Sequence, residues 1–210
     1  LAFSGYREVL LHRADGSGSA ARLPGASDRI HSLLFTKDGK TLIAAGGTPA
    51  RMGEVQVWDV ASRKMLRSMT IGSDTVFGAS LSPDGTLVAV GCTDNSLRVF
   101  EIATGKEVQK IPHHENWVLG TAFGVNGKRI VSVGRDRAAK LTDASNGQFI
   151  ENVNLLRGEL NAIARHPTRD FVVIGGDERI PYYYMMDRPR VMKIADDTTL
   201  ETLDIDSLDV

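Results

Sequence analysis

Apolar and polar residues alternate along short stretches of this chain, most clearly between residues 29 and 70. The alternation predicts four strands there, at 30–36, 41–47, 54–59 and 65–70. In the third stretch, Val55 and Val57 fall on one face and Glu54 and Gln56 on the other, because successive side chains of a strand point to opposite faces. Four short strands so close together predict an antiparallel sheet.

The turn between the first two strands recurs along the chain. It reads TKDGK at 36–40, SPDGT at 82–86, GVNGK at 124–128 and, in a weaker form, HPTRD at 166–170. Glycine tolerates a positive φ there, and Asp or Asn can bond to its own backbone. The interval is roughly 42 to 46 residues, and the longest step contains an insertion at 48–52. A fixed period of this length predicts a repeat architecture.

The repeat divides the chain into sheets that need neighbours. We expect propeller blades over 1–193, with an acidic tail or linker at 194–210; the units are a partial blade at 1–25, full blades at 29–70, 75–111 and 114–156, and a degenerate blade at 158–193. A four-stranded blade cannot cover both of its apolar faces, so blades stack around an axis. The fold class expected is therefore all-β, a β-propeller of about four to five four-stranded antiparallel blades. Closed rings commonly have about four to eight blades, which favours an arc of a larger ring over an irregular small ring.

The third strands of the units carry a family signature. Trp58 and Asp59 close one of them, and the equivalent pairs are Phe100-Glu101, Thr142-Asp143 and Tyr183-Tyr184. These residues, with the repeated turns, resemble the WD-repeat family from about residue 1 to about residue 190. The resemblance implies a β-propeller that binds proteins through loops at the two ends of the ring, although a fold alone cannot name the partner.

The resemblance also implies a buried polar network within a blade. In this family a His before the first strand, a hydroxyl on the second strand, an Asp in the following loop and the Trp bond to one another. His114, Ser132 and Asp136 occupy those positions in the fourth unit, but Thr142 replaces the Trp, so we expect the network there to be incomplete. Asp94 falls on the same loop position in the third unit, and Trp58 is the structural Trp of the second.

Three stretches of the sequence resemble a narrower group within the WD-repeat family. The stretches 4–12, 53–59 and 117–119 resemble bacterial propellers that occur beside c-type cytochrome modules in larger exported proteins. That resemblance implies a periplasmic or exported location and, as an alternative function, the propeller portion of a redox protein with its haem outside this chain. A Cys-x-x-Cys-His motif is absent, and Cys92 is the only cysteine, so no cofactor is expected here and Cys92 is interpreted as a core thiol.

Composition narrows the partner classes. Lys and Arg number 25 against 26 Asp and Glu, which gives a formal charge of −1 and no overall argument for nucleic acid. Six of the acidic residues lie in 196–210, so the rest of the chain is mildly basic and nucleic-acid binding stays a minor alternative. No apolar stretch approaches the roughly 18 residues of a membrane-spanning helix, so no membrane insertion is expected.

The sequence contains no recognisable catalytic motif. The five histidines show no helical pairing, and a structural role is assigned to His114. The stretch 78–82 lacks the second glycine of an esterase elbow, and 16–19 lacks the lysine of a phosphate-binding loop. We therefore expect no enzyme activity, no catalytic residue and no metal site.

The candidates that remain are contacts for a protein partner or for other domains of the same polypeptide. Arg51 and Met52 lie in the insertion, which is either a binding loop or a neutral elongation. Asn116 and Trp117 follow the His loop, and Trp117 is either an interface hot spot or a core residue. Arg135 and Arg137 lie in one loop and Arg179 in the corresponding loop of the next blade, and together they form either a basic rim or ordinary solvated charge. The function predicted is a noncatalytic protein-interaction and scaffolding module of a larger bacterial protein.

Overall fold

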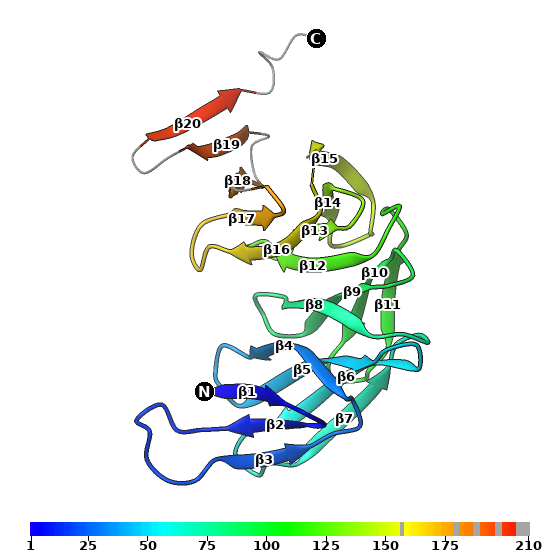
Figure 1. The fold of residues 1–210 in the computed structure, drawn as a ribbon, viewed down its shortest axis with the longest axis vertical. Helices are drawn as coiled ribbons and strands as arrows, with labels where there is room; N and C mark the ends of the chain where they lie inside the picture. The colour runs from blue at the N-terminus through cyan, green and yellow to red at the C-terminus, as the bar shows by residue number, and fades with distance from the viewer. Residues whose placement is uncertain (156–157, 179–180, 187–189, 196–198, 205–210) are drawn as a thin grey trace.

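The regular structure of the described residues consists of β-strands. The computed structural model describes residues 1–155, 158–178, 181–186, 190–195 and 199–204, and these contain twenty strands and no helix. The strands form five antiparallel sheets that follow one another along the chain and curve into an arc (Figure 1). The prediction of an all-β, propeller-type fold is confirmed.

Three sheets have four strands each, joined in sequence order. Their strands are β4 (Arg29–Phe35), β5 (Thr41–Thr48), β6 (Met52–Asp59) and β7 (Met65–Thr70); β8 (Val76–Leu81), β9 (Leu87–Cys92), β10 (Leu97–Glu101) and β11 (Glu107–Ile111); and β12 (Val118–Phe123), β13 (Arg129–Gly134), β14 (Ala138–Asp143) and β15 (Phe149–Leu155). Aspartate-glycine or asparagine-glycine turns join their first two strands, with Gly39, Gly85 and Gly127 at positive φ. Each turn therefore places a glycine where the backbone needs the left-handed region.

The first sheet has three strands, which are β1 (Ala2–Gly5), β2 (Glu8–Leu11) and β3 (Ala21–Pro24). β1 lies against β4 in the way that β5 lies against β8, β9 against β12 and β13 against β16. The three strands therefore occupy the second, third and fourth positions of a blade.

The last sheet corrects the sequence analysis. It has five strands, namely β16 (Leu160–Arg165), β17 (Phe171–Gly176), β18 (Tyr182–Met185), β19 (Arg190–Ala195) and β20 (Thr199–Asp204). Residues 194–210 were expected to lie outside the blades as a tail or linker, but β19 continues to Ala195 and β20 pairs with it from Ala195↔Thr199 to Arg190↔Asp204. The expectation was wrong for 194–195 and 199–204, because a backbone ladder can extend a sheet whatever the charge of the side chains.

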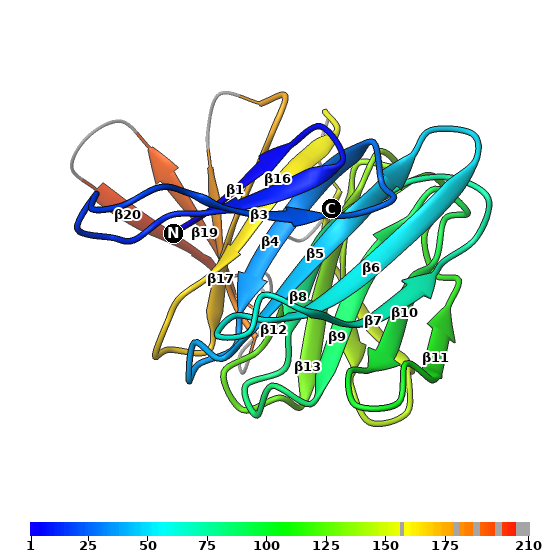
Figure 2. The ribbon, with the colours of Figure 1, turned by 90° about the horizontal axis from the view of Figure 1, so that it is seen from below.

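The first strands of the blades lie next to one another on the concave side of the arc. β4 neighbours β8, β8 neighbours β12, and β12 neighbours β16. Figure 2 shows β4, β8 and β12 side by side, with β7, β10 and β11 displaced to one side of them. Side chains are small where these strands approach most closely: a Cβ on Gly78 would lie 2.5 Å from the Gly120 Cα atom.

Apolar clusters fill the space between successive sheets. Ile43, Ala45, Val55 and Val57 of the second sheet face Val88, Val90 and Cys92 of the third, whereas Leu42, Ala44 and Trp58 face Val9 and Leu23 of the first. Alternate residues of one strand therefore belong to different clusters, because both faces of an interior blade are covered. Burial raises the pKa of the Cys92 thiol to about 12, as the core position requires.

The outer strands of two blades hold the next blade by the same contact. Arg67, the third residue of β7, donates from Nη2 to the Ala103 carbonyl oxygen at 2.6 Å. Gln109, the third residue of β11, donates from Nε2 to the Ala144 carbonyl oxygen at 2.9 Å. In both cases the acceptor lies in the turn between the third and fourth strands of the following blade, where Ala103 is the second residue after β10 and Ala144 is the first residue after β14.

Candidate functional site

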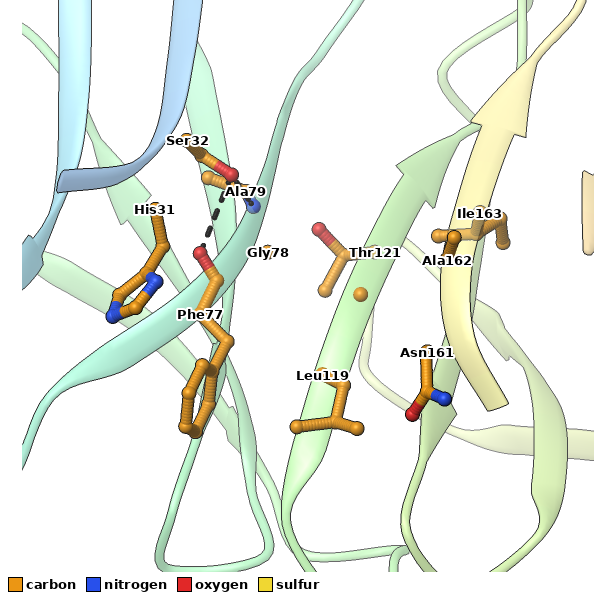
Figure 3. A pocket seen from close by; sticks show the side chains of 11 residues that line it. His31, Ser32, Phe77, Gly78, Ala79, Leu119, Thr121, Asn161, Ala162 and Ile163 are labelled. Carbon is orange, nitrogen blue, oxygen red and sulfur yellow. Dashed lines mark hydrogen bonds between the residues drawn. The ribbon is translucent and has the colours of Figure 1, made fainter. Parts of the chain in front are cut away.

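A hollow lies on the concave side where the first strands of four blades begin. It has a volume of about 350 Å³, with His31 of β4 and Phe77 of β8 on one side and Leu119 of β12 and Asn161 of β16 on the other (Figure 3). Ser32 ties the first two strands together, since its hydroxyl donates to the Phe77 carbonyl oxygen at 3.3 Å and accepts from the Ala79 amide at 3.0 Å. The lining combines apolar side chains, such as Phe77, Leu119 and Ile163, with polar groups of Ser32, Thr121 and Asn161, and a mixture of this kind can both hold and orient a ligand.

A row of stacked side chains continues from the hollow across three blades. The His31 and Phe77 ring centroids are 5.2 Å apart, and the Phe77 and Trp117 centroids are 5.7 Å apart with the planes 25° from parallel. The Arg135 guanidinium lies 4.8 Å from the centre of the Trp117 ring, and its Nε donates to Glu159 at 3.1 Å. We call His31, Phe77, Trp117 and Arg135 the aromatic ladder, and the end of the arc that carries it the ladder end.

The ladder is partly open to solvent and already ordered. Phe77, Trp117 and Arg135 are half-buried, and His31 is exposed. Burial of its ring and the charge of Arg29 lower the pKa of the His31 imidazole, which favours its neutral form at pH 7. Because Trp117 is half-buried and stacks between Phe77 and Arg135, it is neither a fully buried core residue nor a freely rotating one.

Asn161 gives the hollow a defined hydrogen-bond acceptor. Its Nδ2 donates to Asp177 at 3.0 Å, and Asp177 also accepts from the Glu159 amide. With the nitrogen held in this way, the Asn161 side-chain oxygen points toward Leu119, which lies on the same side of the hollow (Figure 3). It is available to a donor on a ligand.

The polar residues of the fourth blade come together as one network. His114 Nδ1 lies 2.9 Å from Asp136 Oδ2, and His114 Nε2 lies 2.8 Å from Ser132 Oγ. The Thr142 hydroxyl, at the position of the family's Trp, is buried and has no hydrogen-bond partner among the residues that the structure describes. Burial alone would raise the pKa of the Asp136 carboxyl, but the bonds from His114 and from the Glu115 and Ala138 amides hold it below its usual value.

This network has the residue types of a hydrolytic triad, since the serine (Ser132) bonds to the histidine (His114) and the histidine bonds to the aspartate (Asp136). Their burial prevents that chemistry, because Ser132 is only 2% exposed and His114 only 6%. A nucleophile has to reach a substrate carbonyl carbon, and Ser132 Oγ lies in the interior of a blade. The network is therefore structural.

A second buried network was missed by sequence reasoning. Glu54 and Gln56 are 2% and 1% exposed, although alternation alone gave no sign that their face would be covered. Gln56 Nε2 donates to Glu54 Oε2 at 2.7 Å, and Trp58 Nε1 donates to Gln56 Oε1 at 3.0 Å. Ser27 and Ser68 also donate to the Glu54 carboxylate. The one available signal was the position of Trp58, which is where the family places a polar network.

Asp94 lies in an exposed network rather than a buried one. Arg98 Nη2 and Lys110 Nζ lie 2.5 and 3.1 Å from its Oδ2 atom, and Ser96 bonds to its other oxygen. Burial would raise the pKa of the Asp94 carboxyl, but these three donors hold it well below its usual value. The three donors therefore keep Asp94 charged and fix the turn after β9.

The insertion is a hairpin extension, not a free loop. Thr48 ends β5 and Met52 begins β6, and the two residues pair in register. Only residues 49–51 turn the chain, with Ala50 at φ +56° and its amide bonded to Asp74 Oδ1 at 2.9 Å. The expectation of a loop over 48–52 was wrong at both ends, because the two strands are eight residues long and carry the extra residues themselves. Arg51 is exposed at the tip and Met52 is half-buried.

Of the other residues predicted to contact a partner, only some lie in or beside the aromatic ladder. Arg135 joins the ladder, while Asn116 is exposed and bonds through Oδ1 to the Trp117 amide at 2.8 Å. Arg179 lies outside the described residues. The described part of the chain contains no group of three His, Cys, Asp or Glu side chains placed to hold a metal. Within it, no helix has the length and apolar character needed to cross a membrane.

Comparison with known proteins agrees with this geometry. The family model described as "WD domain, G-beta repeat" matches residues 64–101 and 105–143. The chain carries WD40 repeats. Proteins of this family act in protein–protein interaction and scaffolding and are generally noncatalytic.

Relatives of the WD40 chain come from distant organisms. It is 33% identical over 130 residues to Transcription factor unc-37 of Caenorhabditis elegans, which covers 62% of this chain and 20% of that protein. It is 30% identical over 141 residues to the uncharacterized WD repeat-containing protein sll1491 of Synechocystis, which covers 67% of this chain and 39% of that protein. The chain thus spans less than two thirds of the length of these relatives.

The fold itself is shared with a solved assembly. A chain in the crystal structure of a mitotic checkpoint complex superposes with a TM-score of 0.78 at 18% sequence identity, covering 91% of this chain and 68% of that one. At this identity the similarity establishes the WD40 propeller architecture and nothing narrower. None of the comparisons contributes evidence for a link to c-type cytochromes.

Proposed function

We propose that the ladder end is a docking surface for a protein partner, and that the chain is a noncatalytic interaction module of a larger bacterial protein. The observation that carries the proposal is the half-buried stack of Phe77, Trp117 and Arg135 beside the hollow. Trp and Arg are enriched among the residues that dominate binding energy. Because the stack and Glu159 already order Arg135, little side-chain entropy remains to be lost on binding.

The hollow adds two features to the aromatic ladder, namely space for an apolar side chain and a hydrogen-bond acceptor. An apolar side chain of a partner fits between Phe77 and Leu119, and the Asn161 oxygen accepts a hydrogen bond from the partner's backbone or side chain. The inner strands below are packed closely enough that a Cβ on Gly78 or Gly120 would clash, so the surface rests on a stiff base. We propose a protein as the ligand, rather than a nucleic acid or a membrane, since the ladder end offers aromatic and neutral polar groups instead of a row of cations.

The redox alternative rests on sequence resemblance alone. A propeller portion of a protein with c-type haem elsewhere would have a Cys-x-x-Cys-His motif in the parent reading frame. Reading that frame tests the alternative without any experiment on this chain.

The docking proposal is tested by site-directed photo-cross-linking. A photoreactive amino acid at His31, incubated with an extract of the source cells, should link to a discrete protein identified by mass spectrometry. Adding Trp117→Ala should reduce the yield about ten-fold or more, because loss of a central aromatic contact typically costs about 2 kcal/mol or more. The same probe at Lys64, on a distant turn, is the matched control and should give no such product.

Two results would overturn the proposal. One is a cross-link from His31 whose yield is unaffected by Trp117→Ala; the other is an absence of protein products at His31. Because Trp117→Ala could disturb the fold, Arg135→Ala is the second variant, and circular dichroism must match the parent protein for either to count.

A further inference from the structure

The opposite end of the concave side has a second and larger hollow. It has a volume of about 740 Å³ and lies among the turns that join the first and second strands of the blades, with an apolar lining that consists of Phe35, Leu81, Pro83, Val125 and Pro167. Phe35 is 40% exposed there. We call this the turn-end hollow.

Five cations line this hollow or lie on the turns beside it. Lys37 and Arg165 line it from opposite blades, and Lys40, Lys128 and Arg169 lie on the same set of turns or next to it. Among the described residues, none of these five takes part in an ion pair. The charges of Lys37 and Arg165 are therefore available to a ligand, whereas the charge of Lys40 already helps to lower the pKa of the Asp38 carboxyl.

Asp38 and Asp84 line the hollow together with Lys37 and Arg165, and both carboxylates already accept hydrogen bonds within their own turns. Asp38 Oδ1 accepts from Thr36 Oγ1 at 2.7 Å and from the Lys40 amide at 3.1 Å. Asp84 Oδ1 accepts from Ser82 and Thr86 in the same way. The Thr36 and Ser82 hydroxyls and the turn amides lower the pKa of both carboxyls, so the acids stay ionised while serving the turns.

The third carboxylate, that of Asp170, joins two turns. It accepts from the Val125 amide at 3.1 Å and from Asn126 Nδ2 at 3.2 Å. The turns thus carry five cations and three ionised carboxylates, which leaves an excess of positive charge, and the carboxylates are committed to backbone or side-chain donors. An incoming anion gains new ion pairs here, whereas an incoming cation would have to compete with existing hydrogen bonds.

From this arrangement we infer that the turn-end hollow binds an acidic peptide segment of a protein partner. An aliphatic or aromatic side chain of the segment enters between Phe35 and Val125, and carboxylates on either side of it pair with Lys37 and Arg165. This surface is distinct from the ladder end, so either site can exist without the other.

The probe is a short fluorescein-labelled synthetic peptide with one leucine between pairs of acidic residues, titrated with the whole chain and followed by fluorescence anisotropy. The double variant Lys37→Glu/Arg165→Glu should weaken binding about ten-fold or more. The matched control is Arg63→Glu/Lys64→Glu on an outer turn, which changes the net charge equally and should stay within about two-fold. Replacing the peptide's leucine by serine should weaken binding about ten-fold, since the apolar contact is lost.

Each remaining outcome contradicts the inference. Equal weakening by both double variants would mean attraction to net charge only, and an effect of Trp117→Ala would place the peptide at the ladder end. Tighter binding of an oligouridylate with the same dependence on Lys37 and Arg165 would assign the site to nucleic acid. Absence of peptide binding at millimolar protein concentration would show that the turn-end hollow is not a binding site for an acidic peptide. The variants Lys37→Gln and Arg165→Gln, checked by thermal unfolding, guard against loss of the fold.

Discussion

At the residue scale, the two buried networks differ in how they end. In the second blade, the Trp58 indole nitrogen completes a series that runs through Gln56 to Glu54, so each polar group has a partner. In the fourth blade, Thr142 stands where the Trp would be, and its hydroxyl is left without one. A buried polar group without a hydrogen bond typically costs about 1–3 kcal/mol.

The unpaired hydroxyl gives a direct prediction. Thr142→Val keeps the shape of the side chain and removes the group that has no partner, so we expect the free energy of unfolding to rise by about 1 kcal/mol. Urea titration followed by circular dichroism measures it. Thr121→Val is the control, because the Thr121 hydroxyl donates to the Ala89 carbonyl oxygen at 3.2 Å and the variant should lose stability. A loss of equal size in both variants would contradict the reasoning.

At the element scale, the first strands stay close because they carry small residues at the points of contact. Gly78 of β8 faces the Gly120 backbone of β12, and Gly120 in turn faces Ile163 of β16, where a Cβ would lie 2.8 Å from the Ile163 Cγ2 atom. The floor of the hollow at the ladder end is therefore set by glycine spacing, and a single methyl group would alter it.

Gly78→Ala tests that spacing. The added Cβ would lie 2.5 Å from the Gly120 Cα atom and 2.6 Å from the Leu119 carbonyl oxygen, so β8 and β12 must separate. We expect a loss of about 1–3 kcal/mol in the free energy of unfolding. Gly175→Ala is the matched strand substitution, since nothing lies within 4 Å of its added Cβ, and it should be close to neutral. Thermal denaturation of both variants decides between a steric and a general glycine effect.

Some strands and contacts could be predicted from the sequence, and others could not. Alternation and the repeated turns placed β4 to β7 within two residues, because both are local properties of the chain. The burial of Glu54 could not be predicted in this way, since it depends on Ser27 in the link between β3 and β4. The partnership of Phe77 with Trp117 likewise arises only when β8 and β12 lie side by side. β20 was missed because nothing in its acidic sequence alternates clearly.

At the scale of the whole molecule, the blades differ in how much of them is covered. The second, third and fourth sheets lie between two neighbours and share apolar clusters with both. The first sheet shares one cluster, and Phe3 on its other face is 53% exposed. In such a stack, stability depends on the interfaces between neighbours, so it should fall toward the ends.

Hydrogen exchange should reveal this gradient. Amides in β9 and β13 are expected to exchange on the order of 100-fold more slowly than amides in β2, because opening the first sheet disrupts one interface and opening an interior sheet disrupts two. Mass spectrometry of peptides from each sheet provides the measurement. Equal protection of β2 and β9 would show that the five sheets open as one unit.

The contacts from Arg67 and Gln109 to the next blade use a main-chain oxygen as acceptor. Such an oxygen is present whatever amino acid occupies positions 103 and 144, so mutation there does not remove the bond. Only the donor side needs a long side chain bearing N–H, and arginine and glutamine both meet that need. Successive units can therefore diverge in sequence over evolutionary time while their alignment with one another is inherited unchanged.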